Sequence, residues 1–193
     1  MIHNKYFEVM EHFLKGYNKE IYGRELVGKV KISQKNIALT LNELENEGVL
    51  SSKTKGNVKH YFLNKENPLI KKYLILFEIQ NSIEFLKKNP KINHIFEKFV
   101  SIDNIICIFG SYAKGIQKKD SDLDLFIIGR FDEKEIKRIG DVYNIKISIK
   151  GGNYSDFIDS LKRNNLLMNE ILDSHIIILG YEKFVNEVIK QKW

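Results

Sequence analysis

The fold of this chain is decided by residues 105–125, which read IICIFGSYAKGIQKKDSDLDL. The run Ile105–Phe109 is continuously apolar and has the length of a buried strand. Gly110 follows it directly, and a glycine at the end of a strand lets the backbone turn tightly and approach a ligand. Ser111 then opens a predicted short helix, whose first N–H groups suit a phosphate. The stretch therefore predicts a strand that ends in a phosphate-binding turn.

Two aspartates stand at the start of the next predicted strand, Leu123–Ile128. Because successive side chains of a strand point to opposite faces, Asp122 and Asp124 share one face and the leucines beside them share the other. Mg²⁺ prefers oxygen ligands and is usually held by one or two carboxylates together with substrate phosphates. We therefore expect Asp122 and Asp124 to bind Mg²⁺ beside the phosphate turn.

The combined motif, FGSYAKG at 109–115 and DSDLDL at 120–125, resembles the signature of the DNA polymerase β-like nucleotidyltransferase superfamily. It is most similar to the minimal nucleotidyltransferase branch in archaea and bacteria. The resemblance implies that Gly110 and Ser111 hold the triphosphate of a nucleotide such as ATP, and that Asp122 and Asp124 are the catalytic metal ligands. Lys114 either contacts phosphate or is a solvated lysine.

Members of that superfamily carry a third carboxylate on the following strand, which the resemblance places at Ile145–Ile149. The polar positions in and beside this predicted strand are Asn144, Lys146 and Ser148, and none is acidic. A lysine directed into the site would repel a metal ion, although it would suit a phosphate. Three interpretations stay open: an enzyme that transfers a nucleotidyl group to a hydroxyl, a catalytically degenerate regulator that keeps nucleotide binding, or an antitoxin-like partner of a toxin protein.

The N-terminal part has the pattern of a winged helix-turn-helix. Helices are predicted over Tyr6–Leu14, Gly23–Lys29 and Gln34–Glu47, the last with Ser33 as its N-cap. Two short strands around Gly56-Asn57 predict a β-hairpin. Residues 41–63 also resemble the MarR and ArsR regulator families, which implies binding to double-stranded DNA.

In that interpretation the start of the third helix enters a groove, and the basic hairpin contacts phosphates. Residues 1–65 contain 11 Lys and Arg against 7 Asp and Glu, which suits a polyanionic partner. A protein-binding or dimerisation role is the alternative for this part. The predicted DNA-binding residues are Ser33, Gln34, Lys35, Asn36, Lys53, Lys55 and Lys59.

We predict an α+β protein in three parts: a winged helix-turn-helix at 1–66, a helical connector at 67–103, and a nucleotidyltransferase domain at 104–193 with a small mixed sheet flanked by helices. The connector contains an unusually apolar helix over Leu69–Leu86, suited to burial or to a dimer contact. The order resembles archaeal proteins that fuse a regulator-like winged helix to a minimal nucleotidyltransferase. That resemblance also implies a toxin-like helical protein as a partner, and winged-helix regulators are commonly homodimers.

Composition places the chain among globular proteins, with 43% hydrophobic and 29% charged residues and a net charge of +6. Its single cysteine, Cys107, lies in the apolar run of the first predicted strand, where a buried thiol is expected. The N-terminus lacks a signal-peptide pattern, and no apolar stretch reaches the roughly 20 residues that span a bilayer. We expect a cytoplasmic protein without a membrane partner.

Overall fold

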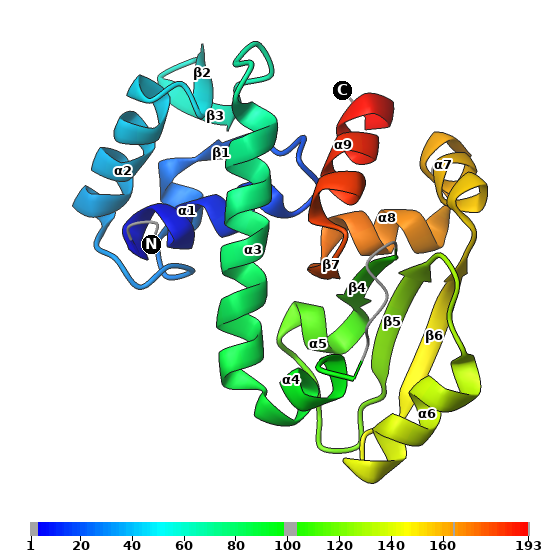
Figure 1. The fold of residues 1–193 in the computed structure, drawn as a ribbon. Helices are drawn as coiled ribbons and strands as arrows, with labels where there is room; N and C mark the ends of the chain where they lie inside the picture. The colour runs from blue at the N-terminus through cyan, green and yellow to red at the C-terminus, as the bar shows by residue number, and fades with distance from the viewer. Residues whose placement is uncertain (1–3, 99–103, 164, 193) are drawn as a thin grey trace. The chain divides into compact units, whose positions relative to one another are not determined.

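The computed structural model describes residues 4–98, 104–163 and 165–192 (Figure 1). The chain forms two compact units, of which the first ends at Gln80 and the second runs from Asn81 to Lys192. The boundary falls inside helix α3 (Ile70–Lys88). The predicted division of the chain into three parts, with boundaries after residues 66 and 103, stays a prediction. Residues 99–103 and Trp193 lie outside the described residues.

The first unit contains helices at its start and centre and a three-stranded antiparallel sheet of order β1-β3-β2. The Ser33 side chain caps α2 by accepting a hydrogen bond from the Asn36 N–H at 3.3 Å, as predicted. The hairpin turns at Gly56, whose φ of 59° lies in the left-handed region that favours glycine. The elements are α1 (Asn4–Leu14), β1 (Ile21–Tyr22), η1 (Gly23–Leu26), α2 (Gln34–Asn46), β2 (Leu50–Lys55) and β3 (Val58–Leu63).

The predicted helix over Gly23–Lys29 is wrong. Only one 3₁₀ turn, η1, forms there, and the two-residue strand β1 precedes it. The turn is held at its start because the Tyr22 N–H donates to the Glu25 carboxylate at 3.3 Å. It cannot continue as a helix through Gly28, whose φ is 80°. Sequence spacing missed β1 because two residues are too few to show alternation.

The core of the first unit is mostly apolar and contains one buried carboxyl, on α3. Glu78 is fully buried, and the Tyr17 hydroxyl donates a hydrogen bond to its carboxyl at 2.6 Å. The hydroxyl supplies the hydrogen-bond partner that a buried polar group requires. The sequence predicted an unusually apolar connector helix here, and the buried carboxyl shows that α3 also makes a specific polar contact within the first unit. The buried apolar side chains of this unit include Val9, Met10, Phe13, Leu26, Ile37, Leu41, Leu44, Leu63 and Leu74.

The second unit is built on a four-stranded mixed sheet of order β6-β5-β4-β7 (Figure 1). Strand β5 pairs in parallel with β6 and antiparallel with β4, and β4 pairs antiparallel with β7. The predicted α+β class with a small mixed sheet flanked by helices is confirmed for this unit. The strands are β4 (Ile105–Phe109), β5 (Leu123–Ile128), β6 (Ile147–Gly152) and β7 (Ile176–Leu179). The helices are α4 (Pro90–Phe96), α5 (Gly110–Lys114), α6 (Glu133–Val142), α7 (Tyr154–Arg163), α8 (Leu166–Asp173) and α9 (Tyr181–Lys192).

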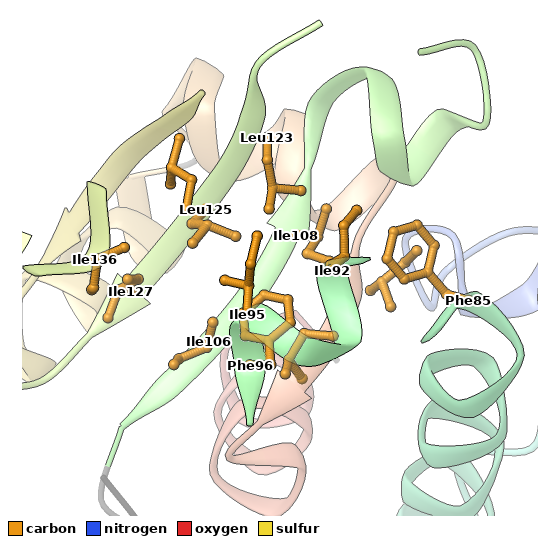
Figure 2. Close-up of a cluster of buried hydrophobic side chains, with 13 residues drawn as sticks. Phe85, Ile92, Ile95, Phe96, Ile106, Ile108, Leu123, Leu125, Ile127 and Ile136 are labelled. Atoms are coloured by element: carbon orange, nitrogen blue, oxygen red, sulfur yellow. The ribbon is translucent and has the colours of Figure 1, made fainter. Parts of the chain in front are cut away.

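Different helices pack on the two faces of this sheet. Figure 2 shows Ile92 and Ile95 of α4 packed against Leu125 and other apolar side chains of β4 and β5. On the opposite face, the ring of Phe126 lies 6.0 Å from that of Phe157 on α7. Because side chains alternate along β5, Asp124 shares the face of Phe126 and points away from α4.

Strand β6 begins two residues later than predicted. The sequence placed a strand at Ile145–Ile149, but the chain first makes a turn in which the Ile145 N–H donates to the Gly140 carbonyl at 3.0 Å. Asn144 takes a left-handed conformation in this turn, with φ of 55°. Periodicity alone could not place the boundary, because the apolar side chain of Ile145 continues the pattern of the strand without joining it. The pairing of β6 with β5 beside the site therefore starts at Ile147.

The sequence also predicts helices over Ile92–Val100 and Tyr154–Asn164, which correspond to α4 and α7. Val100 and Asn164 lie outside the described residues. Among the described residues, no helix is both long enough and apolar enough to cross a membrane.

Candidate functional site

The site forms where the end of β4 lies beside the start of β5. Phe109 pairs with Asp124 in the antiparallel register, so the turn at Gly110 comes directly against the Asp124 carboxylate. A Cβ atom on Gly110 would collide with the Asp124 Oδ2 atom, and the φ of Gly110 is 67°. Glycine is therefore required here for conformation and for space. The sequence predicted the glycine for approach to a ligand, and the structure adds a second reason, since it makes room for a carboxylate.

The turn continues into α5, which is only five residues long and ends at Gly115 with φ of 68°. Its N-cap residue, Phe109, makes no side-chain capping hydrogen bond. Ser111 is half-buried in the first turn of this helix. A helix of this length has a weaker dipole than a long one, so phosphate binding at this point would depend on individual N–H and O–H groups.

The two aspartates have different surroundings. Asp122 precedes β5, and its Oδ2 atom accepts from Lys146 Nζ at 2.9 Å. Asp124 lies in β5 opposite Ser148 of β6, whose hydroxyl donates a hydrogen bond to it. Partial burial raises the pKa of the Asp124 carboxyl above its usual value. The charges of Asp122 and Glu170 act in the same direction, and the Ser148 hydrogen bond and Lys150 oppose them.

The place of the expected third carboxylate is taken by uncharged and basic side chains. Ser148 is the direct β6 neighbour of Asp124, and Lys146 is bound to Asp122. Asn144 stays in the turn that precedes β6. Within residues 4–98, 104–163 and 165–192, no group of three His, Cys, Asp or Glu side chains is arranged to hold a metal ion.

Glu170 is a member of the site that sequence analysis did not predict. It lies on α8, and its Oε1 atom accepts from Lys114 Nζ at 2.7 Å. Its charge also contributes to the raised pKa of Asp124. No sequence signal marks it, because 56 residues separate it from Lys114 along the chain. Lys114 is thus paired with a carboxylate, where the sequence had left it as either a phosphate ligand or a solvated lysine.

The residues present fit one Mg²⁺ ion better than two. Asp122 and Asp124 supply the one or two carboxylates that Mg²⁺ usually takes beside substrate phosphates. A second ion would need another carboxylate, and Ser148 stands in that place. The Lys146–Asp122 ion pair does not block the first ion, because the Lys146 side chain is 80% exposed and such surface pairs contribute only about 0–1 kcal/mol.

Comparison with known proteins agrees with this geometry. Residues 90–183, which contain the whole β4–α5–β5 motif, match the family model "Polymerase beta, Nucleotidyltransferase". The match supports a nucleotidyltransferase-like family for this part of the chain, as the sequence motif predicted. No curated protein matches the chain.

Two solved structures are distantly similar. One is described as a crystal structure of a toxin-antitoxin with AMP-PNP; it is 17% identical, with 53% of this chain and 82% of that chain covered and a TM-score of 0.38. The other is TrmBL2, an archaeal chromatin protein; it is 12% identical, with 99% of this chain and 92% of that chain covered and a TM-score of 0.28. At these scores neither likeness carries function to this chain.

The predicted DNA-binding residues fall into two groups. Ser33, Gln34, Lys35 and Asn36 are all exposed around the first turn of α2. The three hairpin lysines are exposed but paired: Lys53 and Lys55 both bind Glu20, and Lys59 Nζ lies 2.5 Å from Glu45 Oε2. Hydrogen bonds from the first two lysines lower the pKa of Glu20 to about 2. The positive charge of the hairpin is therefore largely compensated within its own unit.

The raised pKa of Asp124 predicts a gain in stability when its charge is removed. Because the pKa is higher in the folded state than in the unfolded state, the folded state loses stability as pH rises through the folded pKa. We expect Asp124→Asn to have a higher Tm than the natural chain at pH 7, and the difference to shrink as pH falls toward 3. Differential scanning calorimetry between pH 3 and pH 7 measures this. Asp159→Asn, an exposed aspartate on α7, is the control; a D124N protein no more stable than D159N at pH 7 would contradict the account.

Proposed function

We propose that the second unit binds a nucleoside triphosphate together with one Mg²⁺ ion, and transfers the nucleotidyl group to a hydroxyl of an acceptor. The α–β phosphoanhydride bond would break, with release of pyrophosphate. The observation that supports this most is the contact between the Gly110 turn and Asp124, which brings a phosphate-suited turn and two carboxylates to one point. Asp122 and Asp124 would hold the ion, which when bound neutralises phosphate charge and orients the reacting oxygens. Gly110 and Ser111 would hold phosphate oxygens through backbone and hydroxyl hydrogen bonds.

The lysines of the site would change partners when such a ligand binds. Lys146 and Lys114 are paired with Asp122 and Glu170, and both ion pairs are exposed and weak. A triphosphate offers both lysines a more highly charged partner. The lysines would then neutralise part of the negative charge of the phosphates. This role would explain why a basic residue, Lys146, stands near the place where a third carboxylate was expected.

A regulator that binds nucleotide without turnover is the second candidate. It is favoured by Ser148, since a hydroxyl beside Asp124 cannot act as the carboxylate base that would deprotonate an acceptor. Binding is common to both candidates, and labelling of an acceptor separates them. The toxin-like partner, the homodimer and the cytoplasmic location stay predictions.

Nucleotide binding is expected to depend on both aspartates. Calorimetric titration with each of the four NTPs, with and without Mg²⁺, should show Mg²⁺-dependent binding that Asp122→Asn and Asp124→Asn weaken by about tenfold or more, equivalent to about 1.4 kcal/mol. Asp159→Asn, an exposed aspartate of α7 away from these residues, is the matched control and should bind as the natural chain does. If neither single variant changes the affinity, this assignment of the metal ligands is wrong.

Transfer is tested by incubation of the protein with α-³²P-labelled NTP and a cell extract. Label that enters protein or RNA with the natural chain, and is lost with the Asp122→Asn/Asp124→Asn double variant, supports the enzyme. Binding without labelling supports the regulator.

We propose further that the first unit binds double-stranded DNA as a winged helix-turn-helix. The order of α1, β1, η1, α2 and the β2–β3 hairpin supports this, as does the exposed start of α2. The single 3₁₀ turn in place of the second helix is a departure from the usual motif. In this proposal, Gln34 and Asn36 contact base edges, and the lysines of the hairpin contact phosphates.

Glu20 should weaken DNA binding, because it competes with phosphate for Lys53 and Lys55. We expect Glu20→Gln to tighten binding to duplex DNA and to steepen the dependence of log K on log salt by up to about 2, near 0.9 for each additional phosphate that a lysine neutralises. Fluorescence anisotropy at several salt concentrations measures both quantities. Glu66→Gln, which removes an exposed carboxylate without a side-chain partner in the described residues, is the control. A slope that is the same in E20Q and E66Q would favour the protein-binding alternative.

A further inference from the structure

A cavity of about 720 Å³ lies beside Asp122, in the second unit. It is lined by the end of α3, the start of α4, Tyr112 of α5, the loop that precedes β5 and the turn that precedes β6. Asp124 is not among its lining residues, whereas Asp122 is. The cavity therefore adjoins the proposed nucleotide site and shares Asp122 with it. Its lining contains four lysines: Lys88, Lys91, Lys119 and Lys146.

The charge of this lysine pocket is only partly compensated. Lys88, Lys91 and Lys119 are exposed, and within the described part of the chain they make no ion pair or side-chain hydrogen bond. Other lysines of the same unit do have partners: Lys87 binds Glu84, and Lys137 binds Glu133. The carboxylates in the lining are Asp120 and Asp122, so lysines outnumber them by four to two. Cations gathered in one concavity focus a positive potential that attracts anions.

We propose that the lysine pocket binds phosphate groups. Lysine ammonium groups bind phosphate as point charges and do not require the planar fork of arginine. The lysines come from four separate segments, so the fold gathers them around one volume that can hold more than one phosphate. The proposal rests on the proposed function, which places nucleotidyl transfer next to Asp122. Two sources share this chemistry: a phosphate carried by the acceptor, and the triphosphate of the nucleotide itself.

Lys146 connects the pocket to the metal ligands. It lines the pocket, and its Nζ atom is also 2.9 Å from Asp122 Oδ2. A phosphate in the pocket would draw this lysine away from Asp122, because the lysine is 80% exposed and its ion pair is weak. Occupancy of the pocket would thus leave Asp122 freer to bind a cation.

The test uses inorganic pyrophosphate as the probe, in EDTA, with the full chain. Isothermal titration calorimetry compares the natural chain with Lys88→Gln/Lys91→Gln/Lys119→Gln. The control, Lys134→Gln/Lys137→Gln/Lys162→Gln, removes the same charge from exposed lysines of α6 and α7 outside the pocket. We expect the pocket variant to bind pyrophosphate about tenfold more weakly or worse, and the control to stay within about twofold. Equal affinities for the two triple variants, or no saturable binding by the natural chain, would overturn the proposal.

Two further arms identify the source of the phosphate and separate this proposal from the proposed function. If the pocket variant binds Mg²⁺–ATP as tightly as the natural chain does, the pocket holds a phosphate of the acceptor. If its affinity for Mg²⁺–ATP falls as much as its affinity for pyrophosphate, the pocket holds the triphosphate. Asp124→Asn should lose Mg²⁺-dependent ATP binding and keep pyrophosphate binding in EDTA. If Ser111→Ala loses pyrophosphate binding in EDTA as completely as the pocket variant does, the probe is bound at the phosphate turn of the nucleotide site and the separate pocket is disproved.

Discussion

The close approach between the Gly110 backbone and the Asp124 carboxylate is the constraint on which this site depends. Antiparallel pairing of Phe109 with Asp124 sets it, and the absence of a side chain at residue 110 permits it. The sheet holds this contact in place from both sides, because α4 packs on one face and the Phe126–Phe157 contact covers the other. The same closeness partly buries the carboxylate and raises its pKa, so the geometry that suits a ligand costs some stability in its absence.

The carboxylates around this contact already have partners. Asp122 is bound by Lys146, Glu170 by Lys114, and Asp124 by the Ser148 hydroxyl. Bare Mg²⁺ would have to displace a lysine and leave it unpartnered, and a free triphosphate would leave the carboxylates unpartnered. A Mg²⁺–triphosphate supplies a cation for the carboxylates and an anion for the lysines together. The proposed function therefore favours the complete metal–nucleotide complex over either component alone.

The predictable features of the chain were the local ones. The strand, the Gly110 turn and the Asp122/Asp124 pair follow from an apolar run, a glycine and strand alternation, and the Ser33 cap follows from its place before α2. The errors came from interactions with particular neighbours. The left-handed Gly28 stops the helix that was predicted over Gly23–Lys29, and the left-handed Asn144 delays the start of β6. The two lysine–carboxylate contacts join residues 24 and 56 positions apart, which no spacing rule relates.

The proposed function requires Lys146 and a single cation to compete for Asp122, and titration with Mn²⁺ in the absence of nucleotide measures this competition. Electron paramagnetic resonance titration of the natural chain should give weak binding of one Mn²⁺. Lys146→Met should tighten it by about 1.4- to 5-fold, in line with an exposed ion pair of about 0.2–1 kcal/mol. Lys137→Met, which breaks the Lys137–Glu133 pair on α6, should leave it unchanged. Two bound Mn²⁺ ions, or an affinity that is equal or weaker in Lys146→Met, would contradict the account.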